Sequence, residues 1–483
     1  MNRASTALIK GLMKIGPQML PFADAATDEL TMSQLLRLSL FQVTVGMAAV
    51  LMIGTLNRVM IVELGVPSWI VALMLALPLL AAPLRTLIGF RSDHYRSVLG
   101  WRRVPFIWFG TIAQFGGFAI MPFALLILSG DTTGPLWVGD AAAALAFLLV
   151  GGGLHTVQTV GLALATDLAP ERVRPRVVAL LCAMLLAGMA VSALVFGVLL
   201  RHFSEVRLIQ VVQGAAMITM VLNSLALWKQ EPRNLAPAIA TRRLGFFAAW
   251  TKFAGAERTR RRLVATAIGT AGFSMQDILL EPYGGKILQL PVGATTALTA
   301  MLAVGGGIGL LIAARRLMRG ANPNRVAGFG ALVGVCAFAA VIFAAPAQSA
   351  VVFGLGIGLI GVGGGLFAHG TLTAAMAAAR PEDRGLALGA WGAAQATAAG
   401  LAIALSGFIN DAGATLAVSG ALGDALADPV TGFTLVYGLE ILLLLATIIA
   451  IGPLARKQRK PVEVASPDMS VAARVGLNPG GLR

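Results

Sequence analysis

The sequence has few charged residues, since Asp, Glu, Lys and Arg make up 12% of its 483 residues. This is about half of the share that is usual in a soluble domain. Its two cysteines, Cys182 and Cys336, each lie inside an apolar run, and we interpret both as small core residues. No Ser/His/Asp motif, phosphate-binding loop or metal-ligand spacing is present, so we do not expect an enzyme.

Apolar residues are abundant, at 57% of the chain with a mean hydropathy of +0.82. They form blocks of about 20 residues or more, long enough to cross the hydrocarbon layer of a membrane as helices. The 57 glycines suit close helix packing. A net charge of +15 does not indicate nucleic-acid binding, because the charges lie between the apolar blocks. The first 37 residues contain no apolar core typical of a cleavable signal peptide.

The apolar blocks predict an all-α membrane protein with twelve transmembrane helices. The expected spans are 38–61, 68–90, 104–128, 139–167, 176–200, 206–228, 263–283, 291–314, 325–345, 350–378, 384–409 and 431–453.

The spans divide the chain into two six-helix bundles, 38–228 and 263–453. A cytoplasmic N-terminal segment, 1–37, precedes them, and a cytoplasmic tail that we expect to be disordered, 454–483, follows. The central loop, 229–262, contains four aromatic residues at one-face helical spacing followed by four arginines. This pattern predicts a helix that lies in the cytoplasmic membrane interface.

Lys and Arg are strongly biased to one side of the predicted membrane. The even-numbered connections and both ends of the chain carry most of them. The opposite side has only four, which are Arg58, Arg201, Arg207 and Lys286. By the positive-inside rule, both termini are cytoplasmic.

The two halves repeat each other in sequence. "GGGLHTVQTVGLALATDLAPE" at 151–171 is similar to "GGGLFAHGTLTAAMAAARPE" at 363–382, and "LNRVMIVELGVP" at 56–67 is similar to "LEPYGGKILQLP" at 280–291. The matching segments fall in spans four and ten and in spans one and seven. Parallel six-helix repeats are typical of the major facilitator fold.

The loop between spans two and three resembles the G-x-x-x-D-R-x-G-R-R motif of that fold through Gly89, Asp93, Arg102 and Arg103. His94 stands in place of the first arginine, and an insertion precedes the basic pair. The resemblance implies that this loop holds the two halves together. The equivalent loop of the second half, "RRLMRGANPNR", keeps the cations and lacks the acid.

Few charged residues lie well inside the predicted spans, where each is costly and needs a reason. Asp277 and Glu281 share a face of span seven at i, i+4. Arg58, in the matching repeat region of span one, is a candidate ion-pair partner of Glu281. Glu440 lies in the middle of span twelve without an evident partner, so it is either hydrogen-bonded or lines a cavity.

Several long stretches resemble the PucC/LhaA family of purple phototrophic bacteria. They include "PFADAATDELTMSQLLRLSLFQVTVGMA", "GFRSDHYRSVLGWRRVPFIWFG", "ATDLAPERVRPRVV" and "DILLEPYGGKIL". The resemblance runs from about residue 20 to about residue 455 and is closer to the core-antenna branch. It implies a factor for light-harvesting antenna assembly that binds or delivers bacteriochlorophyll a or a late precursor, in the bacterial inner membrane or the intracytoplasmic photosynthetic membrane.

The resemblance also implies partners, namely the antenna α and β polypeptides and also the reaction centre and pigment-synthesis enzymes, within membrane lipid. His155 and His369, in the repeated segments of spans four and ten, are candidate axial ligands of a chlorin magnesium, with Gln158 on the face of His155. The alternative is that both are hydrogen-bonded packing histidines. Gly385, Gly389 and Gly392 of span eleven are candidates for the contact with antenna helices.

Two other functions stay open. One is a proton-coupled secondary transporter of a tetrapyrrole or another amphipathic small molecule, driven through Asp277, Glu281 or Glu440. The other is an assembly factor for the peripheral antenna. The predicted interior is apolar apart from residues such as Gln42, Gln114 and Gln395, which disfavours a hydrophilic substrate.

The predicted orientation can be tested with single cysteines in a background without Cys182 and Cys336. A Gly420→Cys variant should react with an impermeant thiol reagent in intact cells, whereas a Ser470→Cys variant should react only after lysis, because 420 is predicted outside and 470 inside. Labelling of the Ser470→Cys variant in intact cells would overturn the topology.

Overall fold

The computed structural model describes residues 30–81, 101–130, 135–170, 173–231, 257–378, 384–421, 423 and 426–455. Several sequence predictions concern residues outside these ranges. They are the cytoplasmic segment before residue 30, Gly89 and Asp93, the interfacial helix of the central loop, and the C-terminal tail.

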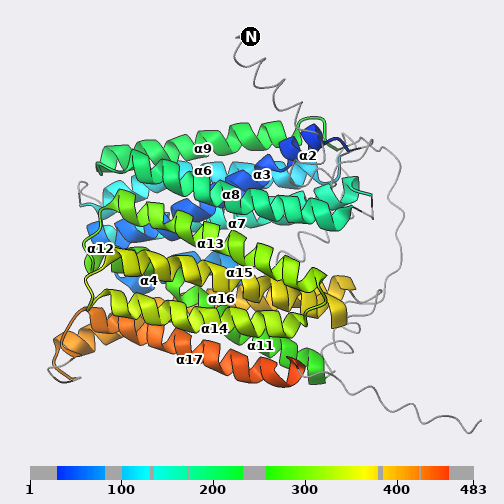
Figure 1. The fold of residues 1–483 in the computed structure, drawn as a ribbon. Helices are drawn as coiled ribbons and strands as arrows, with labels where there is room; N and C mark the ends of the chain where they lie inside the picture. The colour runs from blue at the N-terminus through cyan, green and yellow to red at the C-terminus, as the bar shows by residue number, and fades with distance from the viewer. Residues whose placement is uncertain are drawn as a thin grey trace, which may run out of the picture.

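The described residues are almost entirely helical, and the helices run side by side along one direction (Figure 1). Eleven of the helical segments are long and apolar enough to cross a membrane, and Ser68–Leu80 is a shorter apolar helix at the place of predicted span two. The prediction of an all-α, multi-pass membrane protein is therefore confirmed. Span one begins at Met32, six residues before the predicted start.

The described part of the N-terminal half contains nine helical segments. They are α2 (Met32–Leu38), α3 (Leu40–Ala49), η3 (Val50–Leu56), η4 (Val59–Glu63), α4 (Ser68–Leu80), α6 (Val104–Leu128), α7 (Leu136–Leu168), α8 (Arg174–Leu199) and α9 (Glu205–Leu227).

The C-terminal half contains eight among its described residues. They are α11 (Glu257–Ser274), η5 (Met275–Ile278), α12 (Leu280–Lys286), α13 (Val292–Met318), α14 (Pro323–Ala344), α15 (Ala350–Ala378), α16 (Arg384–Val418) and α17 (Val430–Ala455).

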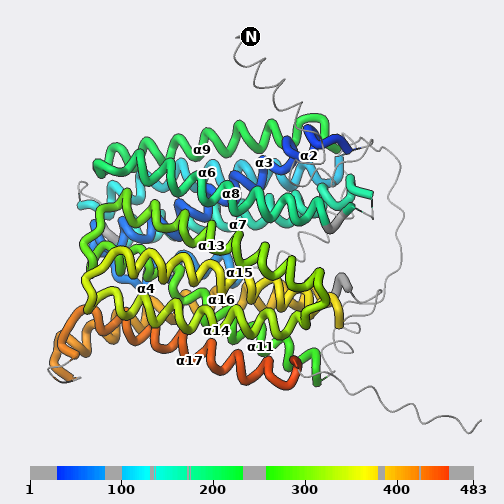
Figure 2. The backbone as a smooth tube through the Cα atoms, viewed as in Figure 1, coloured from blue at the N-terminus to red at the C-terminus, as the bar shows by residue number. Residues whose placement is uncertain are grey.

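The two halves form separate groups of helices that meet along a few helix pairs. Figure 2 shows most of the first half, from blue to green, above the second half, from green to red, while α4 of the first half lies at the level of the second. Across the boundary, α4 packs against α16 and α8 packs against α13. In span numbers these pairs are two with eleven and five with eight, which a twofold axis between the halves exchanges. This arrangement agrees with the repeat found in the sequence.

Glycines allow the halves to approach at the end of the bundle that contains the starts of α4 and α13. A Cβ on Gly197 of α8 would lie 2.8 Å from the carbonyl oxygen of Gly293 in α13, and a Cβ on Gly407 of α16 would lie 2.6 Å from the carbonyl oxygen of Ser68 in α4. Side chains at these positions would force the helices apart. The halves are thus sealed at this end, the predicted periplasmic side.

The cysteines only partly match their interpretation as core residues. Both are free thiols; Cys182 is half-buried, but Cys336 is exposed on α14. The interpretation is wrong for Cys336, because an outward-facing apolar residue in a membrane helix contacts lipid rather than a protein core.

Candidate functional site

Spans one and seven, which are equivalent in the repeat, both depart from regular α-helix in their middle. Span one winds into wide π turns over η3 and η4, and span seven narrows into a 3₁₀ turn at η5 between α11 and α12. Non-α segments within long helices are concentrated at functional sites and hinges. The two segments contact each other across the boundary between the halves.

The break in span seven follows from its sequence. Pro282 has no N–H, so the carbonyl of Ile278, four residues earlier, loses its helical partner. The fully buried side chain of Asn57 fills this vacancy from span one. Its amide nitrogen donates to the carbonyl oxygens of Ile278 at 3.3 Å and Asp277 at 3.1 Å. Because lipid supplies no hydrogen bonds, a broken helix needs such a partner from the protein.

Glu440 is the second partner of the break. Its Oε1 accepts a hydrogen bond from the backbone N–H of Gln276 at 2.7 Å, where the 3₁₀ turn begins. Glu440 is fully buried in α17, and its Oε2 has no hydrogen-bond partner among the described residues. The side chain of Gln276 donates to the carbonyl of Phe273 at 3.2 Å and to Asp277 Oδ1. Of the two alternatives for Glu440, which were a neutral, hydrogen-bonded carboxyl group and a cavity-lining one, the structure shows the hydrogen bond of the first.

Glu281 lies at the contact between the halves. Its Oε1 accepts a hydrogen bond from the hydroxyl of Thr299 in α13, and its Oε2 has no partner among the described residues. A Cβ on Gly54 of span one would lie 2.5 Å from Glu281 Oε1, so a side chain at position 54 would displace this carboxylate.

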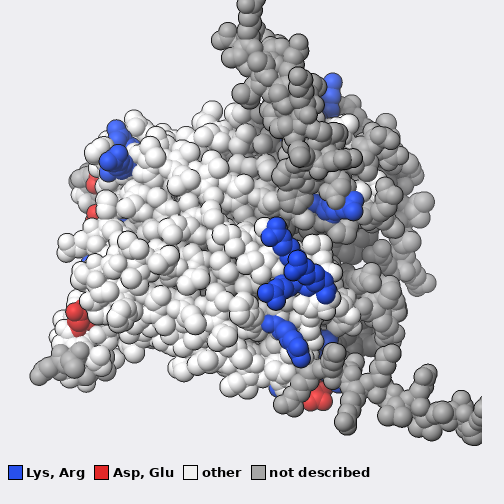
Figure 3. All heavy atoms as spheres, in the orientation of Figure 1, with Lys and Arg blue, Asp and Glu red and all other residues white. Residues whose placement is uncertain are grey.

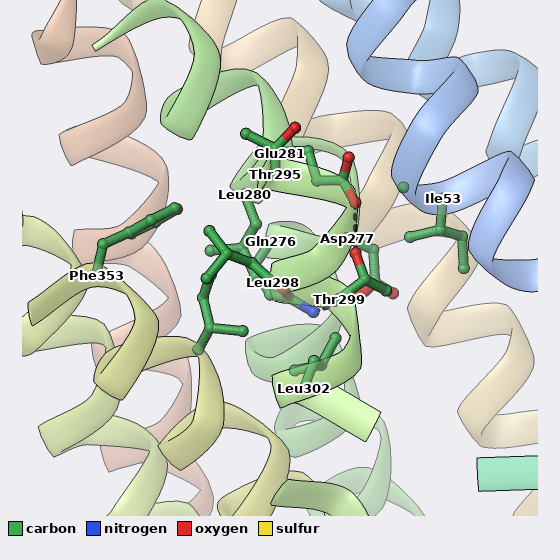
Figure 4. Close-up of a pocket in the computed structure, with 12 residues that line it drawn as sticks. Ile53, Gln276, Asp277, Leu280, Glu281, Thr295, Leu298, Thr299, Leu302 and Phe353 are labelled. Carbon is green, nitrogen blue, oxygen red and sulfur yellow. Dashed lines mark hydrogen bonds between the residues drawn. The ribbon is translucent and has the colours of Figure 1, made fainter. Parts of the chain in front are cut away.

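Asp277 and Glu281 line a small cavity together with Gln276, Thr295, Thr299 and apolar residues of spans one, eight and ten (Figure 4). Its volume is about 30 Å³, which is room for one or two water molecules. The site therefore combines a bent helix, three buried or half-buried carboxyl groups and space for water. Such a group can bind a proton or support a rearrangement of span seven, but it cannot enclose an organic molecule.

Arg58 has a different partner from the predicted one. Its Nη1 forms an ion pair with Glu63 Oε1 at 2.5 Å, and its Nη2 donates to the carbonyl oxygen of Leu290 at 2.8 Å. The guanidinium lies against Gly285, where a Cβ would be 2.9 Å from Nη2. The predicted pair with Glu281 is wrong. In a π turn, residues five apart share a face, which brings Glu63 beside Arg58. The prediction rested instead on the repeat, which places Arg58 and Glu281 in matching regions of the two halves.

Arg102 and Arg103 form a charge network at the start of α6. Arg102 forms an ion pair with Asp167 near the end of α7, and Arg103 Nη2 lies 3.1 Å from Asp167 Oδ2. The carboxylate of Glu231 accepts hydrogen bonds from the backbone N–H groups of Arg102, Arg103 and Val104 at 2.8–3.0 Å. A carboxylate at a helix N-terminus is favourable because it satisfies free N–H groups and opposes the helix dipole.

This network joins α6, α7 and the residues after α9, which all belong to the N-terminal half. We expected the loop to hold the two halves together; the contacts of its two arginines with Asp167 and Glu231 lie within one half. Gly89 and Asp93, on which the predicted interlock depends, lie outside the described residues.

The structure places the candidate pigment ligands apart from the carboxyl site. His155 and Gln158 lie on α7 and are half-buried, and the Nδ1 of His155 is buried without a hydrogen-bond partner among the described residues. His369 is half-buried on α15. The packing alternative requires a hydrogen bond, which the Nδ1 of His155 lacks within the part of the chain that the structure describes.

Sequence reasoning missed several residues of these sites. Asn57, Gln276 and Thr299 satisfy carbonyl or carboxyl groups in the bundle, and Asp167 and Glu231 balance the arginines. The available signals were Pro282 in an apolar span, which requires a donor elsewhere, and the acidic residues that end spans four and six beside a basic loop.

The chain was compared with known proteins. The family described as "PUCC protein" matches residues 55–459. "Protein PucC" of Rhodovulum sulfidophilum is 55% identical, with 85% of this chain and 92% of the relative covered. An "uncharacterized protein in puhA-bchM intergenic region" of Rhodobacter capsulatus is 54% identical, with 90% of this chain and 92% of the relative covered. The "bacteriochlorophyll synthase 44.5 kDa chain" of Rhodobacter capsulatus is 30% identical, with 88% of this chain and 96% of the relative covered.

Solved structures show the same fold at low sequence identity. A bacterial homolog of the human lysosomal transporter Spinster, in an inward-facing and unoccupied conformation, aligns with a TM-score of 0.66 at 14% identity, covering 89% of this chain and 98% of that one. A mutant of the nucleoside transporter NupG aligns with a TM-score of 0.67 at 14% identity, covering 86% of this chain and 99% of that one. The predicted major facilitator fold is confirmed.

The role of Glu440 can be tested by comparing two substitutions. Glu440→Gln keeps an oxygen that can accept from the Gln276 N–H, so the thermal stability of the purified protein should change little. Glu440→Leu leaves that buried N–H without an acceptor and should cost about 1–3 kcal/mol. Equal melting temperatures for the two variants would show that the hydrogen bond does not stabilise the break.

The partner of Arg58 can be tested with double-mutant cycles on unfolding free energy. Arg58→Gln and Glu63→Gln should be coupled by about 0.5–3 kcal/mol, because each single change leaves a charge without its partner. The matched cycle of Arg58→Gln with Glu281→Gln should show weaker coupling. Stronger coupling to Glu281 would restore the pair predicted from the sequence.

Proposed function

This chain belongs to the PUCC protein family, and from that membership we propose that it is an assembly factor for light-harvesting antennae. In this proposal it binds bacteriochlorophyll a or a late precursor and delivers it to newly inserted antenna polypeptides, those of the core complex first. The observation that carries the proposal is the extent of the match, which includes residues 55–459 and relatives above 50% identity over most of both chains. A more distant relative carries bacteriochlorophyll in its name.

Cavity sizes support a role at the membrane-facing surface rather than passage through the interior. The cavity beside Glu281 has about 30 Å³, whereas pockets for organic ligands usually have about 300–1,000 Å³. A groove of that larger size, about 770 Å³, lies between α6 and α9 and is lined by Trp101, Trp108 and Trp228. Aromatic walls at a membrane edge suit a flat macrocycle with a hydrocarbon tail.

His155 and His369 are the candidate ligands of a pigment magnesium. A bound chlorin offers its magnesium an axial position that an imidazole nitrogen can occupy. The residues fit this role because each histidine is half-buried in a membrane helix, and His155 has a buried nitrogen without a partner in the described structure. Gln158, on the same helix as His155, is a polar neighbour for the pigment.

The proposed partners are the antenna α and β polypeptides, with the reaction centre and pigment-synthesis enzymes as further neighbours in the inner or intracytoplasmic photosynthetic membrane. A face of α16 suits an approaching single helix. A Cβ on Gly389 or Gly392 would meet no atom within 4 Å, so these positions present a surface of small residues. The contacts of Gly385 lie outside the described structure. The role is non-catalytic in this proposal.

A proton-coupled transporter of a tetrapyrrole or another amphipathic molecule is the second candidate. The observation in its favour is the carboxyl site, where Glu281 and Glu440 each have one oxygen without a partner in the described structure, beside two interrupted spans. An assembly factor for the peripheral antenna is a further alternative, distinguished by which antenna depends on the protein.

Deletion of the gene in a phototrophic host should lower the core antenna while pigment synthesis continues, as measured by membrane absorption spectra. Loss of the peripheral antenna alone would favour the peripheral alternative. Unchanged levels of both antennae would contradict the assembly role.

The protein purified from pigmented cells in mild detergent should contain bound bacteriochlorophyll or a precursor. His155→Ala or His369→Ala should remove most of it, because an axial ligand is lost. His202→Ala, an exposed histidine between α8 and α9, is the matched control and should retain the pigment. A colourless preparation that restores antenna assembly would contradict pigment binding.

A further inference from the structure

The basic residues at the start of α6 and α14 occupy equivalent places in the two halves but differ in their surroundings. In the N-terminal half, Asp167 and Glu231 neutralise the arginines and cap the helix. The prolines at 170 and 381 align the ends of spans four and ten with an offset of 381 − 170 = 211. Asp167 therefore corresponds to Ala378 (167 + 211 = 378), which has no charge.

The helix cap is also uncharged in the C-terminal half. Asn322 Oδ1 accepts a hydrogen bond from the backbone N–H of Asn324 at 2.9 Å at the start of α14. Asn324 Nδ2 donates to the carbonyl of Leu454 at 3.1 Å, near the end of α17. Neutral amides thus do here what the carboxylate of Glu231 does in the other half.

Four arginines remain at this place, which are Arg315, Arg316, Arg319 and Arg325. All four are exposed, and none forms an ion pair within the described residues. Figure 3 shows cations gathered where α13 ends and α14 begins, on a surface that is otherwise largely uncharged. Four like charges so close together repel one another unless an anion lies between them.

A groove of about 510 Å³ lies directly beside these cations. Arg316 and Arg325 line its polar end with Asn322, and Ile312, Phe329 and Leu366 line its apolar part. Phe329 is 57% exposed, so the apolar part is open at the surface of the bundle. A ligand that fits has a negatively charged group at one end and a hydrocarbon chain at the other.

We infer that this groove binds an anionic phospholipid. The phosphate lies between Arg316 and Arg325, where the N-terminal half has its own carboxylate, and an acyl chain lies along Phe329 and Ile312. Basic pockets between membrane helices on the cytoplasmic side are known to hold such headgroups. This inference rests on the charge difference between the halves and is independent of the pigment proposal.

The test is a titration of the delipidated protein with phosphatidylglycerol or cardiolipin, followed by native mass spectrometry. Wild-type protein should retain either lipid at lower concentration than phosphatidylcholine. The double variant Arg316→Gln, Arg325→Gln should bind about 30-fold more weakly, given two cations near the phosphate. The matched control Arg258→Gln, Arg260→Gln on α11 removes the same charge from the same end of the bundle and should bind normally.

A further variant tests the comparison between the halves without removing any cation. Ala378→Asp restores the carboxylate of the N-terminal half and should weaken lipid binding by competing for the arginines. Gel filtration checks that every variant stays folded. Equal binding of phosphatidylglycerol and phosphatidylcholine, equal loss in the α11 control, or displacement of the lipid by millimolar inorganic phosphate would each overturn the assignment to a phospholipid.

Discussion

The break in span seven sets the requirements for the polar interior of this protein. Lipid provides no donors or acceptors, so each backbone group released by Pro282 and the 3₁₀ turn needs a partner within the bundle. Asn57 reaches the break from span one and Glu440 from span twelve, while Thr299 from span eight binds Glu281 beside it. The buried polar groups of three other spans thus converge on one irregular segment.

The repeat explains why the structure is symmetric in its backbone and asymmetric in its chemistry. Equivalent spans one and seven are both irregular, but one winds into π turns and the other into a 3₁₀ turn. Equivalent helix starts at α6 and α14 are both capped, one by a carboxylate and one by an amide. Each half therefore satisfies the free N–H groups of the same helix start, but with a charged group in one half and a neutral group in the other. The second half thus has cations without a neighbouring carboxylate at this place, which favours the binding of an anion.

Much of the fold was predictable because the apolar blocks and the repeated segments depend on local composition. The site was predictable only in part. Glu281 and Glu440 stand out as charges within apolar spans, but the partner of Arg58 depends on π winding, which has no clear sequence signal. Asn57 could be connected with Pro282 only through the three-dimensional contact of spans one and seven. The partners of Arg102 and Arg103 within the described structure, Asp167 and Glu231, are far away in sequence and carry no local signal, whereas the predicted interlock through Asp93 stays a prediction.

The contacts at the sealed end bear on whether the protein cycles as a transporter. Among the described residues, six hydrogen bonds cross between the halves there. Two come from Asn57, one runs from Arg58 to Leu290 and one joins Thr55 and Thr296. The other two run from the backbone N–H of Trp69 to Asp411 and from the side-chain amide of Asn410 to Ser68.

At about 0.5–1.5 kcal/mol each, these bonds favour the sealed state by roughly 3–9 kcal/mol, before the glycine-mediated packing is counted. Opening this end would also leave the carbonyls of Asp277 and Ile278 without their donor. A transport cycle must supply new partners for these groups from its substrate or from water, whereas an assembly factor that works at the lateral surface does not need to open this end. The energetics of the seal thus agree with the assembly role.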